Sequence, residues 1–143
     1  MKVEIFKLCD FAQTDSGGKL TIVGIFDVIY AREIPATHGL CALAIEMRFE
    51  RNEDGLKKIK ISFIDSDGKS IMPAIETQLV VRIAPNEAHA KLQAVVLIPQ
   101  LTIPKFGEYS IELAIDGQQV TSTSVFVQHL PTIPHPPTPP QMA

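Results

Sequence analysis

The residues with the clearest chemical potential are acidic side chains near the middle of the chain. Asp65, Asp67 and Glu76 stand at positions one, three and twelve of one segment, which is the ligand spacing of a calcium-binding loop. Two other positions do not fit, because Lys69 occupies the fifth and Ser70 stands where the sharp turn requires glycine. We therefore expect this Asp-Ser-Asp-Gly segment to form a hairpin turn and not a calcium site.

A metal site could also be assembled from loops that are distant in the sequence, and residue spacing cannot reveal such a site. Calcium bound in that way would draw on carboxylates such as Asp10, Asp27 and Asp116. Zinc would draw on the histidines, which are His38, His89, His129 and His135. No two of these imidazoles have a spacing that presents them together, so we expect exposed histidines and no metal or other cofactor.

Nucleophilic catalysis has no recognisable signature in this sequence. It contains no Gly-x-Ser-x-Gly elbow and no phosphate-binding glycine motif. Cys9 and Cys41 both fall on expected strands, which favours two buried, inert thiols; a disulfide between them would need adjacent strands. The hydroxyl run 121–124 fits the solvent face of a strand. We expect no catalytic residue and no enzyme activity.

Composition argues against two classes of partner. The net charge is −3 and aromatic residues make up 6% without any Trp, so we expect no nucleic acid binding. Charged residues interrupt every apolar run before membrane-spanning length, so we expect no membrane insertion. Residues 1–7 lack the apolar core of a signal peptide, and two cysteines are too few for a disulfide scaffold. The expected compartment is the cytoplasm.

The segment Gly107–Val127 is the strongest structural signal, because two alternating stretches flank Asp116-Gly117, a typical hairpin turn. The apolar face of its first strand consists of Tyr109, Ile111, Leu113 and Ile115. A two-residue loop would add Val120 and Phe126 to that face, whereas a three-residue loop would add Val125 and Val127.

Six further segments have the pattern of strands: 3–14, 19–30, 41–49, 58–63, 75–83 and 92–98. Segment 19–30 is apolar on both faces, so we expect a central, doubly buried strand in which Gly24 marks a bulge or a close backbone approach. Segment 41–49 alternates cleanly, which predicts a half-buried strand. Together they predict an all-β, antiparallel β-sandwich of about eight strands, immunoglobulin-like, with a closed β-barrel as the alternative.

A change of composition after Leu130 predicts a domain over residues 1–130 and a proline-rich tail over residues 131–143. Six of the ten residues from position 131 are prolines, which favours an extended polyproline II conformation. The tail lacks flanking Arg or Lys to orient it in an SH3-type groove. Its candidate partner-binding residues are Pro131, Pro134, Pro136, Pro137, Pro139 and Pro140.

Several short motifs, in their order along the chain, resemble a family of small bacterial proteins of unknown function. They are Leu8-Cys9-Asp10-Phe11-Ala12, Gly18-Lys19-Leu20, Gly24, Pro35, Asp65-Ser66-Asp67-Gly68, Gly107-Glu108-Tyr109, Ile115-Asp116-Gly117 and Phe126-Val127. The resemblance spans nearly the whole domain, excludes the tail and implies a bacterial, stand-alone, cytoplasmic β-sandwich. It transfers no catalytic residue.

Unpaired sheet edges and the proline-rich tail lead us to expect a non-catalytic protein that acts through protein–protein contact or self-association. The alternative is a small-molecule or glycan binding module that uses the loops Arg32–Gly39 and Gln100–Phe106 at one end of the sandwich.

Overall fold

The computed structural model describes residues 1–131 and 139–141, which form an all-β fold of eleven strands and one 3-10 turn, η1 (Arg51–Glu53). The strands are β1 (Lys2–Thr14), β2 (Leu20–Ile25), β3 (Val28–Ala31), β4 (Ala36–His38), β5 (Cys41–Glu50), β6 (Gly55–Asp65), β7 (Ile75–Val81), β8 (His89–Ile98), β9 (Leu101–Ile103), β10 (Gly107–Ile115) and β11 (Gln118–His129). All eight expected strands occur. The total is eleven because segment 19–30 is two strands and both expected loops contain a short strand.

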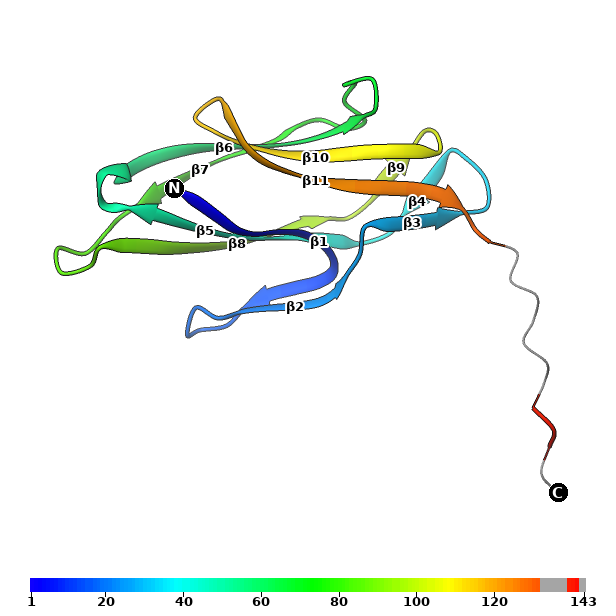
Figure 1. Cartoon of the computed structure of the whole chain (residues 1–143), viewed down its shortest axis with the longest axis horizontal. Helices are drawn as coiled ribbons and strands as arrows, with labels where there is room; N and C mark the ends of the chain where they lie inside the picture. Colours follow the sequence, from blue (N-terminus) through cyan, green and yellow to red (C-terminus); the bar gives the residue numbers. More distant parts are fainter. Residues whose placement is uncertain (132–138, 142–143) are drawn as a thin grey trace.

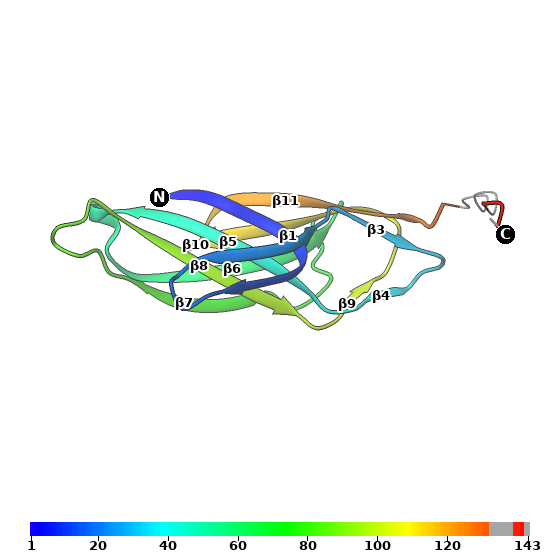
Figure 2. The same cartoon turned by 90° about the horizontal axis from the view of Figure 1, so that it is seen from below.

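Two large sheets face each other (Figure 1), with strand orders β2-β1-β5-β8 and β3-β11-β10-β6-β7. The strands are long, twisted and curled (Figure 2), and β4 pairs with β9 in a third, small sheet. Pairing is antiparallel except between β3 and β11, which run parallel. Neither large sheet closes on itself within the described residues, so the closed barrel does not describe this architecture.

The main core lies between the two large sheets and is built by alternate residues of their strands. Leu43, Ile45 and Met47 of β5 face Ile111 and Leu113 of β10 across this core, and all five are at most 1% exposed. Strand alternation explains the pattern, because every second side chain points to the same face. The apolar face expected for the first strand of the 107–127 hairpin is therefore confirmed.

The β10–β11 hairpin combines features of both expected registers. Its loop has two residues, Asp116 and Gly117, both at positive φ as a type I′ turn requires. A bulge follows, since Leu113 pairs with Thr121 while Ala114 pairs with Gln119. The extra residue in β11 shifts its register against β10 by one residue, so Val125 and Val127 become buried core residues despite the two-residue loop.

The expectation of one central, doubly buried strand over 19–30 is wrong. The chain breaks after Ile25 and continues in the opposite sheet as β3, and β2 is an edge strand on which Val23 and Ile25 are more than half exposed. Gly24 has φ +69° and its backbone lies against the side chain of Asp10, which confirms the expected close approach.

Strand β5 is buried on both faces, so the prediction of a half-buried strand over 41–49 is also wrong. The β1–β2 hairpin bends across the outer face of its own sheet (Figure 1), and its turn shares a pocket with Lys91 and Gln93 of β8. This fold-over creates a second apolar cluster, composed of Cys9, Ala12, Ala42 and Ala44 with Ile5, Leu20, Ile22 and Val95. The alternation of residues within one strand does not reveal whether another part of the chain covers its outer face.

The prolines of the expected tail fall partly outside the described residues. Pro131, Pro139 and Pro140 are described and exposed, whereas Pro134, Pro136 and Pro137 lie outside the described part, as does His135. The boundary between domain and tail remains a prediction. In the described part of the chain, no helix has the length and apolarity needed to cross a membrane.

Candidate functional site: an open sheet edge

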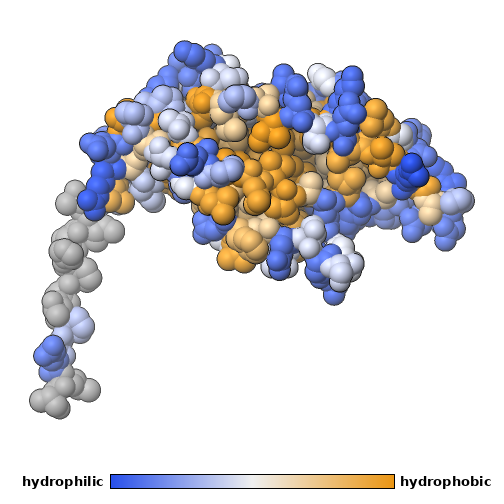
Figure 3. All heavy atoms as spheres, turned by 180° about the vertical axis from the view of Figure 1, so that it is seen from behind, coloured by the Kyte–Doolittle hydropathy of each residue, from blue (hydrophilic) through white to orange (hydrophobic). Residues whose placement is uncertain are grey.

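Strands β7 and β8 are the last strands of their sheets and lie along the same side of the molecule, away from β11 (Figure 2). The turn of the β1–β2 hairpin reaches the outer face of β8 at Lys91 and Gln93. On the opposite side β1 contacts β11 and closes the core. We call the side formed by β7 and β8 the open flank. Apolar side chains gather on the face seen from behind (Figure 3).

The open flank leaves inward-facing side chains of the core partly exposed. Leu92, Ala94 and Val96 of β8 point toward the core but are only half-buried, as are Ile75 and Leu79 of β7. The β5 residues that pair with the three β8 residues, such as Leu43 opposite Val96, are fully buried. Water therefore reaches apolar surface here that the other side of the fold covers.

Strand β8 is also a long edge with unpaired backbone groups. Over its ten residues it pairs only with β5 among the described strands, so alternate N–H and C=O groups face outward. Its one lysine, Lys91, lies near the start and binds Glu46 at 2.9 Å. From Gln93 to Ile98 the strand has no charge and no proline, the devices that usually protect an edge.

The other edges are shorter, bent or charged. Strand β3 has four residues, and β2 is interrupted by Gly24 at positive φ. Strand β7 presents Glu76 opposite Lys60 on its outer face. At ten residues, β8 is the longest of these edges, against six for β2 and seven for β7.

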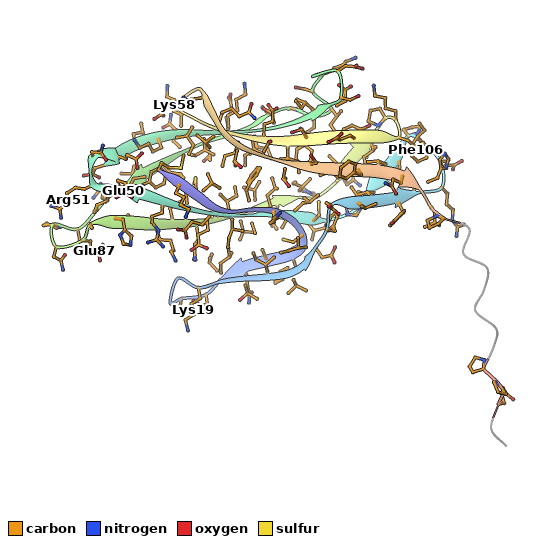
Figure 4. The ribbon with its side chains drawn as sticks, viewed as in Figure 1. Lys19, Glu50, Arg51, Lys58, Glu87 and Phe106 are labelled. Atoms are coloured by element: carbon orange, nitrogen blue, oxygen red, sulfur yellow. The ribbon has the colours of Figure 1, made fainter. Side chains whose placement is uncertain are left out.

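An arginine holds the connection between β7 and β8 in place. The Arg51 guanidinium donates hydrogen bonds to the carbonyl oxygens of Ala84, Pro85 and Glu87, the last at 2.7 Å. Figure 4 shows Arg51 and Glu87 at the same end of the molecule, beside Glu50. The loop at the end of the open flank is thus fixed to the turn between β5 and β6.

The two loops expected for a ligand site meet through β4 and β9, where Thr37 pairs with Thr102. Beside them is an open pocket of about 310 Å³, lined by residues 29–33 and 35–38. Its charged side chains, Arg32 and Glu33, are exposed. The two charged groups therefore lie at the rim of the pocket.

The three acidic side chains of the calcium-like segment do not lie together as ligands. Asp65 Oδ1 accepts hydrogen bonds from the N–H groups of Asp67 and Lys69, both at 2.9 Å, and Lys105 Nζ lies 3.2 Å from Asp67 Oδ2. Glu76 lies on β7. No three His, Cys, Asp or Glu side chains come together among residues 1–131 and 139–141.

The remaining candidate ligands lie apart. Asp116 accepts a hydrogen bond from the N–H of Lys58, and Asp10 packs against Gly24. The described histidines have other neighbours: His38 lies near the ring of Phe26, His89 Nε2 lies 3.0 Å from Arg48 Nη1, and His129 stacks on Phe106, with ring centroids 3.9 Å apart. Phe106, labelled in Figure 4, lies where the chain leaves the domain.

Acid is expected to weaken the Asp65 turn. The N–H groups of Lys69 and Asp67, with the Lys105 ammonium 3.6 Å away, hold the pKa of this carboxyl below its usual value, although burial opposes the shift. A lowered folded-state pKa stabilises the fold above the unfolded-state value of about 3.9, and this contribution disappears as the pH falls further. At pH 7 Asp65→Asn should therefore be less stable than the unmodified chain, and the gap should close below about pH 4.

Urea unfolding of both chains at pH 7 and at successively lower pH measures this gap. The matched control is Asp67→Asn, because the Asp67 side chain is 79% exposed and accepts no backbone hydrogen bond in the turn. A gap for Asp65→Asn that stayed constant with pH would contradict the assignment.

Both cysteines are buried free thiols, so the expected burial is confirmed and the disulfide is not formed. They lie on adjacent strands, but Cys9 pairs with Ala42, so Cys41 points to the opposite face of the sheet. Cys9 Sγ lies 3.5 Å from the carbonyl oxygen of Ala42. Burial raises the pKa of the Cys41 thiol to about 11, which disfavours the reactive thiolate.

The sequence pattern predicts the strand that is β8 but does not mark it as a site. A signal was present, since an uncharged run from Gln93 to Ile98 is bounded by Pro99 and preceded by only one lysine. That run is ordinary in the middle of a sheet and unusual at an edge, and strand order decides which applies.

Fold and site together define a class: a small all-β protein with a two-layer core and one unprotected sheet edge. The chain belongs to the family of unknown function DUF6941, whose family model matches residues 4–128. The resemblance drawn from the short motifs is thereby confirmed. The chain matches no curated protein.

Proposed function

We propose that this chain is a non-catalytic protein that acts through protein–protein contact, by associating with copies of itself. The observation that carries the proposal is the open flank, where half-exposed core side chains and unpaired backbone groups of β8 occur together. A partner strand would remove the apolar surface from water and would form hydrogen bonds with the unpaired backbone groups.

The chemistry of the described residues supports a contact role. The Asp65 carboxylate accepts hydrogen bonds within a turn, Asp67 binds Lys105, and the Cys41 thiol has a raised pKa. The described histidines contact aromatic rings or an arginine. These groups have structural neighbours that account for them.

Light scattering coupled to size-exclusion chromatography tests the proposal. We expect the full chain to have at least twice the monomer mass, with apparent mass rising with concentration. A variant that ends at Leu130 shows whether the sheet edge or the proline tail makes the contact. We expect this variant to associate as the full chain does. A full chain that remained monomeric across this range would refute the proposal.

We further propose that the strand arrangement is immunoglobulin-like. Strands β1, β5 and β8 would correspond to A, B and E of one sheet, and β6, β10 and β11 to C, F and G of the other. Buried Tyr109 at the start of β10 donates from its hydroxyl to the carbonyl oxygen of Lys105, at 2.6 Å, as in a tyrosine corner. A crystal structure with a different strand order would contradict this assignment.

A small-molecule or glycan site is a second candidate, favoured by the pocket of about 310 Å³ beside the paired loops. Binding there would raise the melting temperature in the presence of ligand, and Arg32→Ala would abolish that increase. A sugar and metabolite panel without any Arg32-dependent increase would count against it.

We also propose that the protein works in the cytoplasm, where buried thiols such as Cys9 and Cys41 stay reduced. Fractionation of host cells followed by thiol labelling of the unfolded chain checks this. Recovery outside the cytoplasm, or recovery with a disulfide, would contradict it.

A further inference from the structure

We propose that two copies of this chain join their β8 strands side by side, antiparallel about a two-fold axis, so that two four-stranded sheets form one continuous eight-stranded sheet. This inference rests on the proposed self-association and names its interface. The occupant of the open edge is therefore a second copy of the same strand.

The charge pattern of β8 favours a second copy as its partner. Lys91 is near the start of the strand, and no charged residue follows it as far as Ile98. Antiparallel pairing places the two Lys91 side chains at opposite ends of the new ladder, whereas parallel pairing would place them together. A two-fold arrangement thus keeps the two lysines apart and pairs the residues from Leu92 to Val96 with uncharged residues.

The faces of β8 also match in this arrangement. Directly opposite residues of an antiparallel pair lie on the same face, so the inward-facing Leu92, Ala94 and Val96 meet their counterparts and extend the core. On the outer face, Val95 and Leu97 of one copy lie opposite outer-face residues of β8 in the second copy. Leu97 is 57% exposed in the single chain, which leaves apolar surface to cover.

Residue 97 reports on this geometry because it approaches Lys91 of the second copy. With the axis at Ala94 the two are directly opposite, and with the axis at Val95 they are diagonal neighbours on the same face. In the single chain Leu97 lies opposite Ala42 of β5, with Ala44 diagonal to it, whereas Lys91 lies opposite Arg48, with Glu46 diagonal to it on the same face. Glu46 already binds Lys91 at 2.9 Å, which balances part of its charge.

Two variants of opposite charge test the inference. Leu97→Lys should weaken dimerisation about tenfold, since the lysine faces Lys91 of the second copy and the two-fold axis repeats the repulsion. Leu97→Glu should bind about as tightly as the unmodified chain or more tightly. Sedimentation equilibrium at low salt gives the dissociation constants, and the difference between the variants should shrink at 0.5 M salt, where charges are screened.

The matched controls are Leu56→Lys and Leu56→Glu on β6. Leu56 is 53% exposed, close to the exposure of Leu97, but lies in the other sheet. We expect neither control to change the dissociation constant, and far-UV circular dichroism should show all four variants folded. A charge-dependent effect at residue 97 alone would support the paired β8 strands.

Other outcomes would overturn the inference in distinguishable ways. Equal weakening by Leu97→Lys and Leu97→Glu would show that Leu97 is covered by another surface and that β8 does not pair with itself. An unmodified dimer that neither variant changes would exclude β8 as the interface while leaving self-association intact. A monomeric unmodified chain would refute both proposals.

Discussion

Replacement of Phe63 by alanine is expected to lower the free energy of unfolding by about 3–5 kcal/mol, the largest effect of any change considered. Phe63 is 1% exposed and lies on β6 opposite Ile111, at the centre of the main core. The void beside it is only about 10 Å³, and it is lined by Ile103, Tyr109 and other buried side chains. Because the neighbouring side chains are already closely packed, they cannot move in to fill the space of the deleted ring, and a cavity remains.

Urea or guanidinium unfolding, followed by circular dichroism, measures this loss. The control is Phe11→Ala, which removes the same ring from a position that is 47% exposed and should cost much less. Equal losses for the two variants would contradict the assignment of the core. The comparison separates core packing from aromatic content.

Replacement of Gly24 by alanine is the second large expected effect. The left-handed backbone at φ +69° costs an L-residue about 1–2 kcal/mol. In addition, the new methyl group would lie 2.9 Å from Cγ of Asp10, so the carboxylate must move. We expect a loss above that range, with disturbance concentrated in the β1–β2 hairpin.

Gly18→Ala is the matched control for this change, because Gly18 also has positive φ, +78°, but open space around it. Its loss should stay near the backbone cost alone. Combining Gly24→Ala with Asp10→Ala should recover the additional loss, and a double-mutant cycle by chemical unfolding measures that coupling. If the two glycine variants lost equal stability, the close approach would have no energetic role.

Local patterns predicted much of this fold because they depend on near neighbours. The alternation of Tyr109, Ile111 and Leu113 places them on one face wherever the strand goes. Asp116 and Gly117 accept positive φ more readily than most residues, so their turn could also be predicted. The bulge that selected Val125 and Val127 could not, because one extra residue in either strand leaves the alternation of each strand unchanged.

Such patterns could not predict the candidate site, because the position of β8 at an edge depends on the strand order of the whole sheet. The sequence by itself determined the all-β class, most strand positions, the polar turns and the absence of a charge from Gln93 to Ile98. Only the tertiary structure decided that segment 19–30 divides between sheets, that the β1–β2 hairpin covers β5, and that β8 has no second neighbour. The physical reason is that burial and backbone pairing of a strand depend on partners distant in the chain, whereas its own residues determine only which side chains share a face.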